Sequence, residues 1–130
     1  MSAIAQQIYP VLLARPEIRL AILFGSAALG KERFESDVDL AIDIGAPLSA
    51  EEKMVLIGEL AERTGRPIDL IDLHTVGEPL LGQIVVSGVR MMGDDTAYAN
   101  LIKRHWFEEA DFMPYVRRLL AERGQAWIAR

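Results

Sequence analysis

Acidic and apolar residues alternate along residues 37–43, Asp-Val-Asp-Leu-Ala-Ile-Asp. Val38, Leu40 and Ile42 occupy every second position, and three of the four positions around them are aspartates. Alternate residues of a β-strand point to opposite faces of a sheet, so this pattern predicts a strand with one polar face. Aspartate is disfavoured in strands, and two in succession on one face imply that something compensates their charge.

Apolar runs, helical periodicity and turn residues predict the other elements. The apolar run from Ile18 to Phe24 is typical of a strand, and Ser49 with Glu52 forms a capping box at the start of a helix. We expect strands at 18–24, 37–43 and 67–73, a turn and loop at 27–36, helices at 2–14, 49–64 and 78–87, and a helical region at 94–123. This order predicts an α/β (α+β) fold with a small mixed three-stranded sheet and helices packed on it.

Two prolines lie within predicted helices. Pro10 lacks the N–H that a helix interior requires, so it should kink or shorten the first helix. Pro114 leaves two alternatives for the last helical region: Asp111 caps a new helix, or one long helix bends near the proline.

The size and composition of the chain limit its domains and its metal chemistry. A chain of 130 residues is about one ordinary domain, and 51% apolar content suffices for a core. We expect a single domain over 1–130, with its functional core at about 18–75 and no room for a separate substrate-binding domain. There is no cysteine and only two histidines, so any metal would be bound by oxygen, which favours magnesium, manganese or calcium.

Charge and hydropathy exclude several kinds of partner. The net charge of −5 argues against sequence-independent nucleic-acid binding, which depends on clustered Lys and Arg. The N-terminus has no basic segment followed by an apolar run, and no apolar stretch approaches the roughly 20 residues of a membrane span. We therefore expect a soluble, cytoplasmic protein without membrane association.

Asp37 and Asp39 are candidate metal ligands. On one face of a strand their Cα atoms would lie about 7 Å apart, and two such carboxylates repel each other unless a cation lies between them. They can jointly hold divalent ions, and two magnesium ions roughly 4 Å apart can stabilise the attacking and leaving oxygens of a phosphoryl-type displacement. The alternative is an ordinary solvated strand face, because Asp-x-Asp is a common tripeptide.

Gly25-Ser26 directly follows the first predicted strand. Glycine lets the backbone approach an anion closely, and serine adds hydroxyl and amide donors, so a helical turn starting here would favour a phosphate. An ordinary strand-to-turn exit is the alternative. The segment is not a P-loop, because no Gly-Lys-Ser/Thr follows at the required spacing.

Gly25-Ser26, ten intervening residues and Asp37-Val38-Asp39 together resemble the signature of the DNA polymerase β-like nucleotidyltransferases. The match is closer to the minimal nucleotidyltransferases, the MNT proteins, and covers most of residues 20–44. The resemblance implies the nucleotidyltransferase fold and magnesium-dependent transfer of a nucleoside monophosphate from a triphosphate, with pyrophosphate leaving. It implies two Mg²⁺ ions as cofactor and ATP as substrate.

The family pattern also implies a third carboxylate on the strand after the intervening helix. Asp69 and Asp72 are the candidates, and strand alternation places them on opposite faces without choosing between them. The family's apolar-Asp-Leu pattern favours Asp69, and the other aspartate would then be a strand-edge or capping residue. The implied roles are metal binding by Asp37, Asp39 and Asp69, with Asp69 helping to deprotonate the acceptor hydroxyl.

The resemblance further implies that Gly25 and Ser26 hold the terminal phosphates. Lys31 and Arg33, in the loop that follows, would help to neutralise the triphosphate; as an alternative, each is a solvated loop charge. Ser36 is expected to shape the entry to the next strand by local hydrogen bonds.

The acceptor site is expected to come from a partner, because the chain has no room for an acceptor domain. In the MNT family that partner is commonly a HEPN toxin, a ribonuclease, and the MNT protein acts as antitoxin by adenylylating a tyrosine of the toxin. The resemblance therefore implies AMP transfer to a HEPN protein. A small-molecule nucleotidyltransferase and a non-catalytic antitoxin that inhibits its partner by binding are the alternatives.

The C-terminal helical region carries large apolar groups on more than one side: His105, Trp106, Phe107, Phe112, Met113 and Tyr115. One row of these side chains must pack against the sheet. The large apolar groups on the other side of the helical region predict either an interface with another protein or a region that is core on both sides.

Overall fold

The polar-faced strand is present as β2 (Val38–Asp43) in the computed structural model, which describes residues 2–28 and 36–128. The other elements are α1 (Ala3–Leu13), β1 (Leu20–Phe24), the 3₁₀ turn η1 (Gly25–Ala27), α2 (Ala50–Thr64), β3 (Ile68–Asp72), α3 (Leu80–Ser87), β4 (Val89–Met92) and α4 (Asp95–Ile128). Each helix and strand expected before residue 88 is present, with its ends shifted by two residues or fewer.

The sheet is mixed, as expected, but it has four strands in the order β3-β2-β1-β4. β2 pairs parallel with β3, while β1 pairs antiparallel with both β2 and β4. The prediction of three strands was wrong because β4 has only four residues, two of them exposed, and shows no clear apolar run or alternation. All five residues of β1 are buried, so this strand needs partners on both edges for its backbone groups.

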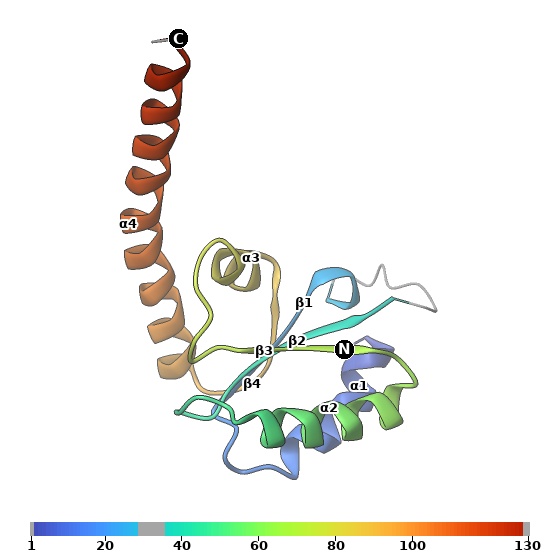
Figure 1. Cartoon of the computed structure of the whole chain (residues 1–130). Coiled ribbons are helices and arrows are strands. Elements are labelled where there is room, and N and C mark those ends of the chain that lie inside the picture. The colour runs from blue at the N-terminus through green and yellow to red at the C-terminus, as the bar shows by residue number, and fades with distance from the viewer. Residues whose placement is uncertain (1, 29–35, 129–130) are drawn as a thin grey trace.

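Helices cover both faces of the sheet (Figure 1). α1 and α2 lie on one face, where the core consists mainly of Ile8, Leu12, Leu23, Val38, Leu40, Ile42, Leu56, Leu60 and Leu70. α3 and the first turns of α4 lie on the other face, where the core consists of Leu20, Ile22, Phe24, Ala41, Leu73, Leu81, Ile84 and Leu101. β1 and β2 contribute to both cores because alternate residues of a strand point to opposite sides.

The ends of the first two long helices follow the sequence signals. The Ser2 side chain accepts a hydrogen bond from Ala5 N at the start of α1, and Pro10 lies inside this helix without ending it. The capping box predicted from Ser49 and Glu52 is present at the start of α2, and Gly65 ends this helix in the left-handed conformation.

α4 is one continuous helix through Pro114, so the alternative of a new helix beginning at Asp111 was wrong. Its first turns pack on the body of the protein through the buried side chains of Leu101 and His105. The rest of the helix projects away from the sheet on the side of α3 (Figure 1). Within the described residues, no helix combines the length and apolar character needed to cross a membrane.

Candidate active site

The end of β1 and the start of β2 bring Gly25 and Asp39 into contact. The two strands pair with Phe24 opposite Asp39, and the chain then turns away at Gly25 with a φ of +71°. A Cβ atom built on Gly25 would lie 2.2 Å from Asp39 Oδ2, which is far inside contact distance. The Asp39 carboxylate therefore lies directly against the backbone of the Gly25-Ser26 turn, and glycine is required there for space as well as for conformation.

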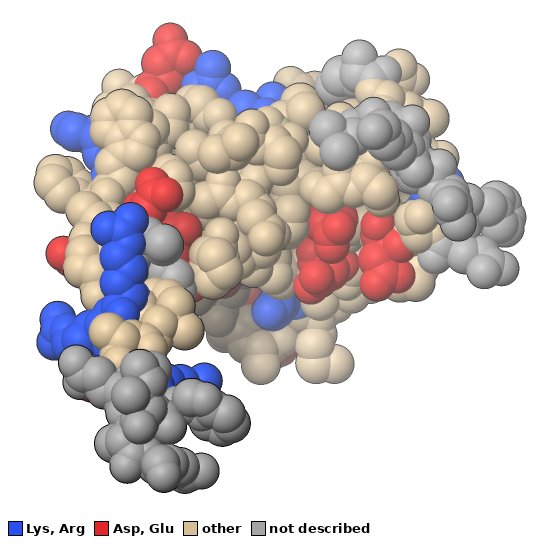
Figure 2. Space-filling view, turned by 90° about the horizontal axis from the view of Figure 1, so that it is seen from above, with Lys and Arg blue, Asp and Glu red and all other residues tan. Residues whose placement is uncertain are grey.

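Asp69 joins this pair from the neighbouring strand. β2 and β3 run parallel in a register that places Asp69 opposite Asp39. Ala41 of β2, Ile71 of β3 and Leu73, which directly follows β3, pack in the core under α3 and α4. Alternate residues of a strand share a face, so Asp39 and Asp69 face the same side as these three residues. Figure 2 looks down on this side of the molecule and shows acidic groups next to each other.

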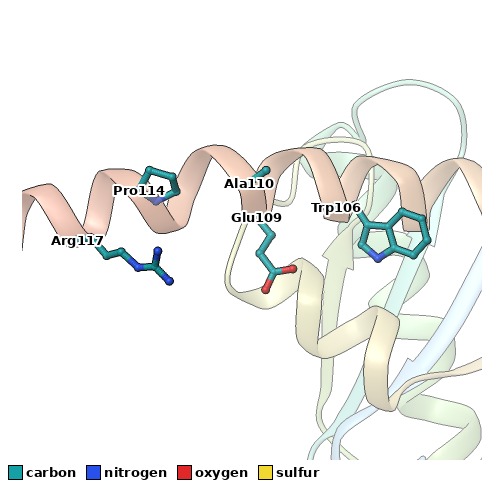
Figure 3. A pocket seen from close by; sticks show the side chains of 5 residues that line it. All are labelled: Trp106, Glu109, Ala110, Pro114 and Arg117. Atoms are coloured by element: carbon teal, nitrogen blue, oxygen red, sulfur yellow. The ribbon is translucent and has the colours of Figure 1, made fainter.

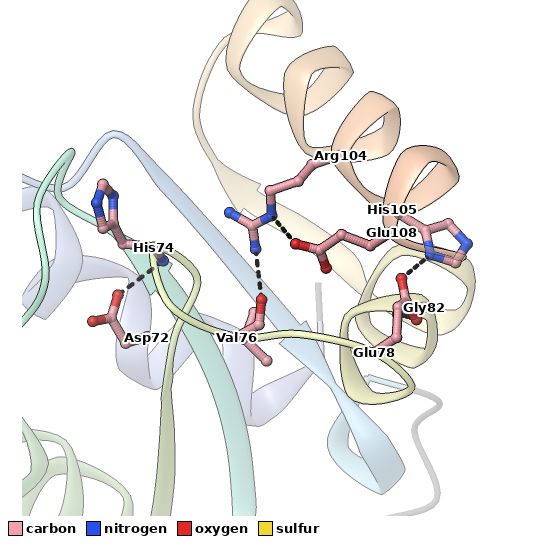
Figure 4. Close-up of polar contacts among 8 residues, drawn as sticks. All are labelled: Asp72, His74, Val76, Glu78, Gly82, Arg104, His105 and Glu108. Atoms are coloured by element: carbon pink, nitrogen blue, oxygen red, sulfur yellow. Dashed lines mark hydrogen bonds and ion pairs between the residues drawn. The ribbon is translucent and has the colours of Figure 1, made fainter. Parts of the chain in front are cut away.

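Asp72 lies on the opposite face of β3 and has a structural role. Its Oδ2 accepts a hydrogen bond from Leu48 N and its Oδ1 accepts one from His74 N, both at 2.9 Å (Figure 4). These bonds tie the loop before α2 to the turn after β3. Asp69, rather than Asp72, therefore lies on the same face as Asp39 and opposite it.

The two aspartates of β3 should respond differently to removal of the carboxylate. We expect Asp72→Ala to lower the free energy of unfolding by about 1–3 kcal/mol, because two backbone N–H groups lose their acceptor. Asp69→Ala, the matched control on the same strand, is expected to change it by less than about 0.5 kcal/mol. Urea denaturation followed by circular dichroism measures both values, and equal losses would contradict the assignment.

Of the remaining residues expected at the site, the structure describes two and leaves two outside the described residues. Asp37 is exposed just before β2, and Ser26 is half-buried in the 3₁₀ turn η1. Lys31 and Arg33 lie outside the described residues. Asp43, the last residue of β2, accepts a hydrogen bond from Gly45 N at 2.8 Å.

Three carboxylates, those of Asp37, Asp39 and Asp69, lie at this end of the sheet. Burial raises the pKa of the Asp39 carboxyl above its ordinary value, and the charge of Asp69, a hydrogen bond with Asp69 and the charge of Asp37 raise it further. A divalent cation would relieve this repulsion, and the available donors are all carboxylate oxygens, which suits Mg²⁺. Within residues 2–28 and 36–128, however, no three His, Cys, Asp or Glu side chains already converge as a metal-binding group.

The raised pKa of Asp39 leads to a prediction about stability. A carboxyl whose pKa is higher in the folded than in the unfolded state disfavours the fold when ionised, and this cost disappears as the pH falls through the folded pKa. Without metal at neutral pH, we expect Asp39→Asn to be more stable than the unsubstituted chain, by less than about 1 kcal/mol because solvent screens the group. Thermal unfolding at neutral and acidic pH checks this: the difference should shrink in acid, and a less stable variant at neutral pH would contradict it.

Sequence reasoning missed the polar contacts that hold α4 to the segment after β3 (Figure 4). His105 Nδ1 contacts Glu78 Oε1, and Glu78 Oε2 accepts a hydrogen bond from Gly82 N at 3.1 Å. Arg104 Nη2 donates to the Val76 carbonyl oxygen at 3.1 Å. The residues are up to 28 positions apart, so no local pattern could have paired them.

The comparisons with known proteins agree with this fold. The family model described as "Polymerase beta, Nucleotidyltransferase" matches residues 6–97, and the chain therefore belongs to this family of nucleotidyltransferases. Among curated proteins, the chain is similar to the protein adenylyltransferase MntA of Shewanella oneidensis, with 31% identity over 87 residues. That match covers 65% of this chain and 63% of the relative, so the chain spans less than two thirds of the relative's length.

Solved structures share the fold over a longer part of the chain. A crystal structure of a toxin–antitoxin with AMP-PNP contains a chain with a TM-score of 0.74 and 23% identity, covering 89% of this chain and 98% of the other. A structure of the tri-AMPylated Shewanella oneidensis HEPN toxin in complex with an MNT antitoxin gives a TM-score of 0.66 at 20% identity, with the same two coverages. At these identities the likeness establishes a shared nucleotidyltransferase fold.

Proposed function

We propose that this chain is a magnesium-dependent adenylyltransferase that transfers AMP from ATP to a tyrosine of a HEPN toxin and thereby acts as its antitoxin. The observation that carries the proposal is the position of the Asp39 carboxylate, which lies against the Gly25 backbone and beside Asp69. This arrangement combines a backbone turn suited to phosphate with acidic oxygens suited to a divalent cation.

The reaction is a displacement at the α-phosphorus of ATP. The acceptor tyrosine oxygen forms a bond to that phosphorus, the bond from the phosphorus to the bridging oxygen breaks, and pyrophosphate leaves. Asp69 is exposed and, among the residues that the structure describes, carries no structural hydrogen bond of the kind that Asp72 makes, so we assign to it the proton of the acceptor hydroxyl. The Gly25-Ser26 turn binds the terminal phosphates through its amide and hydroxyl donors. Lys31 and Arg33 are proposed to neutralise part of the triphosphate charge.

Asp37, Asp39 and Asp69 would hold the Mg²⁺, and two ions are proposed. Bound there, magnesium supplies positive charge to the phosphate oxygens as the displacement proceeds. The half-buried position of Asp39 keeps this carboxylate at the centre of the three and next to the phosphate-binding turn.

The relatives support a protein acceptor. The Shewanella relative is named a protein adenylyltransferase, and the HEPN toxin solved with an MNT antitoxin carries AMP groups. In the described part of this chain, the sheet face that carries Asp39 and Asp69 is covered by α3 and the start of α4, with no further domain beside it. A partner that brings its own tyrosine to this face fits the arrangement.

The proposal is tested by incubating the protein with labelled ATP, Mg²⁺ and the HEPN protein encoded beside it. Mass spectrometry should then show AMP on a tyrosine of the HEPN protein, and EDTA should prevent its appearance. Neutralisation of the toxin without AMP transfer would instead establish a binding antitoxin. Labelling of an aminoglycoside in the absence of any protein partner would establish a small-molecule enzyme.

A further inference from the structure

Most of α4 lies outside the folded body. Leu101 and His105 are buried, but no described side chain from Trp106 onward is. Residues 106–128 therefore form a projecting segment, called here the arm (Figure 1). An isolated helix gains little stability from its own apolar side chains, so the folding of this chain alone does not explain the apolar side chains of the arm.

Exposed apolar side chains concentrate on the arm. Of the ten exposed large apolar residues among those whose side chains the structure describes, five lie there: Trp106, Phe107, Tyr115, Leu119 and Leu120. They include all of the aromatic residues in that set, and Tyr115 is 54% exposed. Tyr115 and Trp106 lie on different sides of the arm, and exposed aromatic groups are enriched in surfaces that bind another protein.

One side of the arm borders a groove with a distinct charge. The groove has a volume of about 530 Å³ and lies between the arm and residues 75–78, with Val76, Glu78, Glu108, Asp111 and Tyr115 among its lining. Three of its lining residues are acidic and none is Lys or Arg. Glu78 is already paired with His105, and Glu108 is paired with Arg104 at 3.7 Å, so Asp111 is the lining carboxylate that is available to a basic side chain next to the Tyr115 ring.

The groove and the carboxylate site belong to the same side of the molecule. The arm projects on the α3 side of the sheet (Figure 1), and Asp39 and Asp69 face that side. Figure 2, which views this side, shows acidic groups on its surface. A protein held in the groove would therefore lie on the side where transfer takes place.

The arm is also part of what the chain shares with antitoxins solved in complex with their toxins. The family model ends at residue 97, before the arm begins. The likeness to the toxin–antitoxin structures covers 89% of the chain and therefore includes part of the arm. The shared fold is thus larger than the nucleotidyltransferase core.

We infer that the groove between the arm and residues 75–78 is the docking site for the acceptor protein, through a segment that carries Lys or Arg together with an apolar anchor. This inference rests on the proposed function, because the acceptor is the protein that receives AMP. A second copy of this chain fits less well, since each copy has a net charge of −5 and the two would repel. The hollow on another side of the arm, at Trp106, Glu109 and Arg117, is lined by α4 alone (Figure 3) and encloses no segment between two elements.

The test uses the full chain and the HEPN protein encoded beside it. The groove variant Asp111→Lys/Tyr115→Ala reverses one carboxylate and removes the aromatic ring. Its matched control, Val55→Ala/Glu62→Lys, makes the same kinds of change on exposed residues of α2, on the other face of the sheet. The groove variant should bind the HEPN protein at least about tenfold more weakly and raise the KM for it by a similar factor. The kcat at saturating HEPN protein and the affinity for Mg-ATP should not change.

The possible results separate the docking site from the proposed function. If the unsubstituted chain adenylylates the HEPN protein and the groove variant does so with the same KM, the docking site is wrong and the function stands. If the unsubstituted chain transfers no AMP to the HEPN protein, both are wrong. A dimer of this chain in analytical ultracentrifugation that the groove variant alone dissociates would assign the groove to a second copy and overturn the inference.

Discussion

Asp39→Asn is expected to lower AMP transfer about a thousandfold or more, which corresponds to roughly 4 kcal/mol in the activation barrier. The substitution keeps the size of the side chain but removes the charge that lies between Asp37 and Asp69. The site that we propose for a divalent cation would lose its central ligand, whereas the fold would lose only a source of repulsion. Chemistry should therefore fail in a protein that remains folded.

The measurement is the rate of AMP incorporation into the HEPN protein, with circular dichroism to confirm the fold. Asp43→Asn is the matched control: Asp43 lies on the same strand and in phase with Asp39, but its carboxylate accepts a hydrogen bond from Gly45 N in a turn. Asparagine can still accept that bond, so this variant should keep its transfer rate within about twofold. Undiminished transfer by Asp39→Asn would refute the proposed site.

Gly25→Ala is expected to lower transfer at least about a hundredfold, which corresponds to roughly 2.7 kcal/mol. The new Cβ would lie 2.2 Å from Asp39 Oδ2, so the carboxylate or the turn must move. Displacing either separates the acidic oxygens from the turn that we propose binds phosphate, and small displacements of reacting groups carry large costs in rate. Because Gly25 has a φ of +71°, alanine also adds about 1–2 kcal/mol of backbone strain.

The Gly65→Ala variant distinguishes the two effects expected of Gly25→Ala, which are the contact with Asp39 and the backbone strain. Gly65 has a φ of +68°, but a Cβ there would meet nothing within 4 Å. It should show the backbone strain alone and leave transfer intact. Urea denaturation and transfer rates of both variants give the comparison. Equal losses of stability together with normal transfer by Gly25→Ala would show that the contact between Gly25 and Asp39 does not matter for catalysis.

Local patterns predicted the elements whose residues carry their own signal. The period-two segment formed β2, the Ser49–Glu52 capping box began α2, and Gly65 ended it. β4 was missed because its residues have no such pattern and pair only to satisfy β1. The continuity of α4 through Pro114 was one of two alternatives, since a proline and a possible cap lie close together at that point.

The sequence alone was sufficient to assign the nucleotidyltransferase class, because Gly25-Ser26 and the Asp37–Asp39 pair are close in the chain and their spacing is specific. The choice between Asp69 and Asp72 needed the register of β3 on β2, which depends on packing between residues far apart in sequence. The groove beside the arm likewise joins segments that are distant in the chain. Periodicity fixes which residues share a face, but only packing determines what that face meets.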